Sequence, residues 1–89
     1  MSTEKLPLLL EIARNASIAR PEGVLQESAA RGLVDLAQDA ITALRSSQGL
    51  DDIEAIRLRK KAQTLRTKVH DLYLLGLFDT FDALLKKRD

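Results

Sequence analysis

The sequence contains no cysteine and no tryptophan, and only four glycines, two prolines and three aromatic residues. Without cysteine, neither a disulfide framework nor a thiolate metal site can form, so a reducing compartment is permitted. Four scattered glycines cannot build a phosphate-cradling loop. No segment approaches the ~18 to 20 consecutive apolar residues that cross a bilayer. Disulfide scaffolds, P-loop enzymes and transmembrane helices are therefore excluded as interpretations.

The N-terminal stretch MSTEKLPLLLEIARN lacks the basic region and long apolar region of a secretory signal, and Glu11 interrupts its apolar residues. We therefore expect a cytoplasmic protein, with the inner face of the membrane as a peripheral location. The chain of 89 residues is short for a self-sufficient core. It predicts one domain spanning residues 1–89.

Apolar residues recur at intervals of three and four, which predicts helices over residues 3–15, 21–46 and 51–72. A short fourth helix is expected over residues 80–87, with Asp79 as its N-cap. Loops of a few residues place consecutive helices antiparallel. The predicted fold is therefore all-α, an antiparallel up-and-down helical bundle with three medium-to-long helices plus a short fourth.

Local signals mark the ends of these helices. Pro21 suits the opening of the second helix, and Gly49 suits a left-handed position after it. Asp51 is expected to cap the third helix, with Glu54 reaching back in a capping box. Gly32 weakens the second helix by up to ~1 kcal/mol relative to alanine, so it is predicted to mark a close helix approach.

Charge is distributed unevenly along the chain. Residues 1–56 carry nine acidic and five basic side chains, whereas residues 57–89 carry four acidic and nine basic ones. The two halves should attract each other, and the second half could attract an anionic partner. The basic stretch from Arg57 to Lys68 is also interpretable as the solvated back of a helix, or as a contact with anionic lipid. A net charge of +1 is lower than the strongly basic charge that is typical of nucleic-acid-binding domains.

An apolar run from Leu72 to Phe78 follows the basic stretch directly. Wrapped on a helix, this run covers every direction, so it is either buried on several sides or exposed as a patch. Core and binding groove both remain open as interpretations. A third-helix seam of residues at heptad-like spacing could in addition join two copies of the chain; its members are Ala55, Leu58, Ala62, Leu65, Val69 and Leu72.

No constellation in the sequence points to catalysis. His70 is the single histidine, and no carboxylate cluster accompanies it at metal-ligand spacing. The carboxylate pairs Asp51 with Asp52 and Asp79 with Asp82 are interpreted as helix-start residues. We therefore predict no enzyme activity, no metal and no cofactor.

The order of features resembles the immunity proteins against pediocin-like (class IIa) bacteriocins. The resemblance rests on LLLEIARNASI, then VLQESAARGLVDLAQDAITAL, the polar turn RSSQGLDD, and a long helix ending in VHDLYLLGLF. It spans nearly the whole chain but contains no strict motif. It implies a cytoplasmic four-helix bundle that protects the producing cell where the toxin has engaged a membrane permease, with specificity carried in the C-terminal half.

The preferred hypothesis is a non-enzymatic protein-interaction domain, specifically a bacteriocin immunity protein. Its expected partner is a membrane permease and bacteriocin complex, with peripheral contact to anionic membrane. The alternative is a small helical regulator or chaperone-like adaptor acting as a homodimer. The predicted partner-binding residues are Arg57, Arg59, Lys60, Lys61, Arg66, Lys68, Tyr73, Leu77, Phe78 and Phe81.

Overall fold

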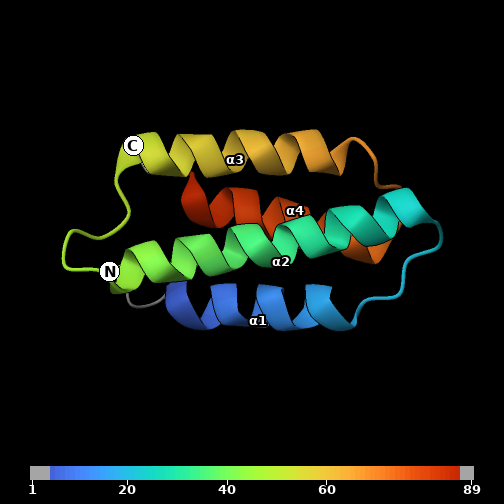
Figure 1. The fold of residues 1–89 in the computed structure, drawn as a ribbon, viewed down its shortest axis with the longest axis horizontal. Helices are drawn as coiled ribbons and strands as arrows, with labels where there is room; N and C mark the ends of the chain where they lie inside the picture. Colours follow the sequence, from blue (N-terminus) through green and yellow to red (C-terminus); the bar gives the residue numbers. More distant parts are fainter. Residues whose placement is uncertain (1–4, 87–89) are drawn as a thin grey trace.

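The computed structural model describes residues 5–86, which form four helices and the loops between them. Successive helices run in opposite directions, so the start of α1, the α2–α3 loop and the end of α4 share one end of the bundle (Figure 1). This arrangement confirms the predicted antiparallel bundle. The helices are α1 (Lys5–Ile18), α2 (Val24–Arg45), α3 (Asp52–Arg66) and α4 (Leu72–Leu85).

The loop between α1 and α2 begins later than the sequence pattern predicts. Helix α1 continues to Ile18, and α2 starts at Val24, so Pro21 is a buried loop residue rather than the opening of α2. The first residues of the expected first helix, up to residue 4, lie outside the described part of the chain. Pro7 occupies the first turn of α1, where its missing N–H costs no intrahelical bond.

The core lies between the four helices and is built from aliphatic side chains around two phenylalanines. Phe78 and Phe81 of α4 are 1% and 0% exposed, and each contributes ~1.5 to 3 kcal/mol by burial. Helix α2 presents alanines to its neighbours, which lets α1 pack closely along it. The other fully buried large side chains are Leu9, Leu33, Leu58 and Leu74.

Helices α2 and α3 approach each other closely at Gly32, as predicted. A Cβ atom built on Gly32 would lie 2.5 Å from Cδ1 of Leu65. This is closer than two carbon atoms pack, so any side chain here would displace Leu65. The absence of a side chain at Gly32 therefore sets the separation of α2 and α3.

The boundary between α3 and α4 corrects the sequence interpretation. Helix α3 ends at Arg66, and α4 begins at Leu72, with Asp71 as its N-cap. The Asp71 carboxylate accepts a hydrogen bond from Leu74 N at 3.0 Å. Asp79, predicted to be a cap, lies inside α4 instead. The apolar run has its own three-and-four spacing, and this carries one helix through Gly76.

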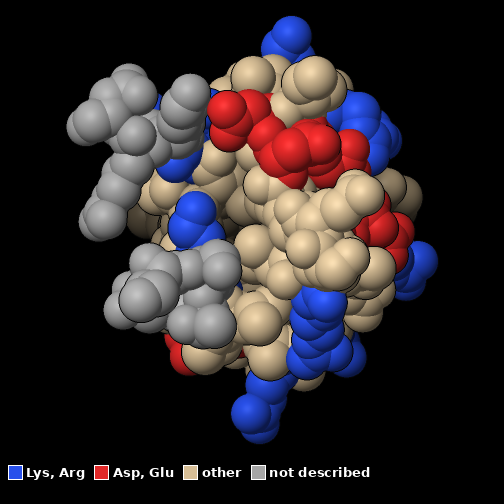
Figure 2. All heavy atoms as spheres, turned by 90° about the vertical axis from the view of Figure 1, so that its left-hand side faces the viewer, with Lys and Arg blue, Asp and Glu red and all other residues tan. Residues whose placement is uncertain are grey.

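The N-terminus of α3 is capped as predicted. The Asp51 carboxylate accepts from Glu54 N at 2.8 Å, although the Glu54 side chain pairs with Arg57 instead of reaching back. Figure 2 shows acidic side chains gathered at the upper edge of this end of the bundle, where α3 starts. Acidic groups favour the positive end of the helix dipole. Gly49 has the predicted left-handed backbone, with φ at 72°, inside the turn that precedes this cap.

Replacement of Gly76 by alanine should raise the free energy of unfolding by ~0.5 to 1 kcal/mol. Apart from the neighbouring backbone of α4 itself and the adjacent residues, no heavy atom lies within 4 Å of a Cβ placed on Gly76, so the gain in helix propensity meets no steric cost. Gly49→Ala is the matched control and should destabilise, because alanine disfavours positive φ. Urea denaturation followed by circular dichroism measures both changes. A destabilised Gly76→Ala variant would contradict a helix through this position.

Candidate interaction surface

Three of the six predicted basic contact residues are engaged within the chain. The Arg59 guanidinium donates to Asp82 of α4 at 2.9 and 3.4 Å. Arg66 forms the same paired geometry with Asp79, also at 2.9 and 3.4 Å. Arg57 pairs with Glu54 one turn earlier in α3. Hence these arginines mainly fasten α3 to α4 and stabilise α3 itself.

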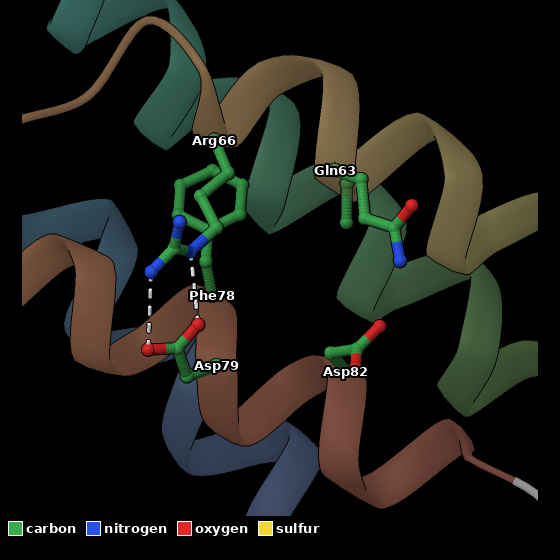
Figure 3. A pocket seen from close by; sticks show the side chains of 6 residues that line it. Gln63, Arg66, Phe78, Asp79 and Asp82 are labelled. Carbon is green, nitrogen blue, oxygen red and sulfur yellow. Dashed lines mark hydrogen bonds and ion pairs between the residues drawn. The ribbon is translucent and has the colours of Figure 1, made fainter.

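A hollow between α3 and α4 lies beside these ion pairs (Figure 3). Its lining residues are Ala62, Gln63, Arg66, Phe78, Asp79 and Asp82. The Arg66–Asp79 pair bridges the two helices at one side of it. The Arg59 guanidinium beside Asp82 lowers the pKa of that carboxyl below its ordinary value. Interpretation of Asp79 and Asp82 as helix-start residues was therefore wrong, because both serve as ion-pair partners within α4.

The apolar members of the predicted contact set divide between core and surface. Leu77, Phe78 and Phe81 are 9%, 1% and 0% exposed, so all three belong to the core, and Phe78 also lines the hollow between α3 and α4. Tyr73, by contrast, is 57% exposed. Their difference follows from the face of α4 on which each lies.

Three lysines from the predicted set remain available. Lys60, Lys61 and Lys68 are exposed, and none forms an ion pair with a carboxylate among residues 5–86. Lys68 lies in the turn before α4, close along the chain to Tyr73. The structure therefore reduces the predicted contact surface to these lysines, the outward parts of the arginines and Tyr73.

Sequence reasoning missed Gln26, the one buried polar side chain recorded for residues 5–86. Its Oε1 accepts from His70 N at 2.9 Å and from Asp71 N at 2.8 Å. Its Nε2 donates to Glu22 O at 2.7 Å. One amide at the start of α2 thus holds the turn between α3 and α4, and we call this set of bonds the Gln26 clamp.

The helical spacing of α2 already indicates that Gln26 lies on its buried face. Counting three, four and seven residues onward from Gln26 reaches Ala29, Ala30 and Leu33, all of which are buried. Leu25, the apolar residue one position earlier, is instead 64% exposed. A polar residue in a buried register position must find hydrogen-bond partners, and this rule would have identified it.

Large apolar side chains are concentrated at the end of the bundle that the Gln26 clamp organises. Helices α2 and α4 both begin there (Figure 1), and side chains in a first turn tilt toward the helix N-terminus. Five of the nine exposed large apolar residues recorded for residues 5–86 lie in the segments that meet at this end. This surface, called the apolar end below, comprises Ile18, Val24, Leu25, Leu72 and Tyr73.

The described residues offer no group of three or more potential metal ligands among histidines and carboxylates. Within residues 5–86, no helix has both the length and the hydropathy needed to span a membrane. Comparison of the chain with protein-family models, curated proteins and solved structures finds no match.

Replacement of Gln26 by leucine should lower the free energy of unfolding by ~2 to 4 kcal/mol. The substitution leaves the part-buried N–H groups of His70 and Asp71 without their acceptor, and an unsatisfied group costs ~1 to 3 kcal/mol when water does not replace the partner. Gln38→Leu is the matched control, because Gln38 lies exposed on the same helix. Chemical denaturation measures both. Equal effects of the two substitutions would show that the clamp contributes nothing to stability.

Asp82→Asn should destabilise the protein at pH 7 by up to ~1 kcal/mol, as expected for a partly exposed ion pair. The lowered pKa of Asp82 means that its contribution is present above the ordinary aspartate value of ~3.9 and is lost as pH falls through the lower folded-state pKa. Unfolding free energies measured from pH 6 to 2 should therefore fall less steeply in Asp82→Asn than in the parent. Asp35→Asn, at an exposed carboxylate outside the ion pairs, should retain the parent slope.

Proposed function

We propose that this protein acts without catalysis, by binding another protein through the apolar end. The concentration of large exposed apolar side chains on an otherwise well-packed bundle supports this function. Leu72 and Val24 are 85% and 80% exposed, although the same chain buries Phe78 and Phe81 almost completely. Exposed apolar groupings of this kind are typical of interaction sites.

The alternative function, a homodimer joined through the α3 seam, has less support. Ala55, Leu58 and Ala62 of that seam are already buried inside the single chain. A homodimer through that seam would require the bundle to open.

The preferred specific function is immunity against a pediocin-like bacteriocin, exerted at the cytoplasmic face of the membrane. Two features support it: the four-helix order of the chain, and the placement of Tyr73 and Lys68 from the C-terminal half at the apolar end. Leu72 and Tyr73 would enter a pocket of the permease and toxin complex, each contributing ~1.5 to 3 kcal/mol by burial. Lys68 would meet anionic groups at the rim, where charges mainly steer encounter.

Expression of this chain in a bacteriocin-sensitive lactic acid bacterium should raise survival under challenge with one or a few pediocin-like peptides. The double substitution Leu72→Ser with Tyr73→Ser should abolish protection, because it removes the apolar contacts while leaving the core intact. Ile53→Ser with Ile56→Ser is the matched control. It removes two exposed apolar side chains from α3 and should protect like the parent.

Three outcomes separate the parts of this proposal. Absence of protection by the soluble parent across a broad peptide panel would refute immunity. Protection by the parent and equally by the Leu72 and Tyr73 double variant would refute the apolar end as the contact surface. Thermal melts of each variant establish that a lost activity does not reflect unfolding.

A further inference from the structure

The turn over residues 67–71 contains the single histidine of the chain, and this histidine contacts the Gln26 clamp. The His70 Nε2 atom lies 3.3 Å from Gln26 Nε2. The ring itself is exposed, whereas Gln26 is only 3% exposed. A titratable group reachable by solvent is therefore bonded to a buried amide that holds two segments together.

The hydrogen bonds determine which protonation state of His70 fits this contact. Oε1 of Gln26 faces two backbone N–H groups, from His70 and Asp71, so the amide cannot be flipped. Nε2 of Gln26 therefore carries both donors, and one of them is used by Glu22 O. The second can bond to His70 only if His70 Nε2 is an acceptor, which requires a neutral ring with its proton on Nδ1.

We propose that protonation of His70 loosens the Gln26 clamp and so makes the turn before α4 a pH-sensitive element. A protonated His70 places an N–H donor against the N–H donor of Gln26. The ring must then rotate away, which leaves a buried Gln26 N–H without its partner. Because the neutral ring fits the closed turn and the protonated ring does not, falling pH favours the open turn.

Other charged and titratable groups lie on the segments around His70. They are Arg20 and Glu22 in the loop before α2, Glu27 in the first turn of α2, Arg66 at the end of α3, Lys68 and Asp71 in the turn itself, and Tyr73 in α4. The Asp71 carboxylate caps α4. Histidine is the side chain that changes charge between pH 5 and 8.

The consequence for binding rests on the proposed function. Leu72 and Tyr73 follow the clamped turn directly, so opening of the turn displaces the first residues of α4, which are two of the five residues of the apolar end. Binding through this surface would then be weaker at pH 5.5 than at pH 7.5. The chemistry of the turn is independent of any partner and can be measured on the protein alone.

Native-state hydrogen exchange by NMR at pH 7.5 and pH 5.5 tests the proposal, with rates expressed as protection factors. Protection of the His70 and Asp71 amides should fall by up to about tenfold at the lower pH. Protection of the Ala55 amide, bonded to Asp51 O at the opposite end, should not change. His70→Asn has no titratable ring and should show equal protection of the turn at both pH values.

An unchanged protection factor at residues 70 and 71 of the parent would overturn the proposal. So would a fall of the same size in His70→Asn, because another group would then be responsible. His70→Gln provides a second neutral side chain if the asparagine variant is unfolded. No partner takes part in this measurement, so its failure is distinguishable from failure of the protection assay.

Discussion

A single buried amide connects the segment before α2 with the turn before α4. Gln26 accepts from two part-buried backbone N–H groups of that turn and donates to the Glu22 carbonyl, so each of these polar groups has a partner. This bond set determines where α4 begins. The position of α4 in turn decides which residues of the apolar run enter the core and which ones remain in solvent.

Two of the arginines in the basic second half of the chain form ion pairs with aspartates of the same half. We expected the acidic first half to attract the basic second half, but Arg59 and Arg66 pair with Asp82 and Asp79 of the adjacent helix. The reason is geometric: antiparallel α3 and α4 bring these side chains within hydrogen-bonding distance. A basic stretch that suggested a binding patch therefore serves largely to join two helices, and only its lysines remain unpaired among the described residues.

The sequence left open whether the apolar run from Leu72 to Phe78 is core or contact surface, and the structure divides the run between the two. Leu74, Leu77 and Phe78 lie in the core, whereas Leu72 and Tyr73 emerge at the bundle end. The same helix can thus anchor the fold and present a contact surface. The proposed binding function and the pH response of the turn depend on the same boundary between buried and exposed residues. A change in the turn would act first on the exposed part.

The sequence by itself determined the helical class, the antiparallel order, the Asp51 cap and the close approach at Gly32, because periodicity and local backbone chemistry are encoded in neighbouring residues. It did not determine the end of α3, since a seam continuing to Leu72 and a turn capped by Asp71 are both locally acceptable. The hydrogen bond from His70 N to Gln26, which lies 44 residues earlier in the chain, favours the turn. Burial of Phe78 and exposure of Tyr73 were likewise decided by tertiary packing, because a run that is apolar on every side does not specify which face turns inward.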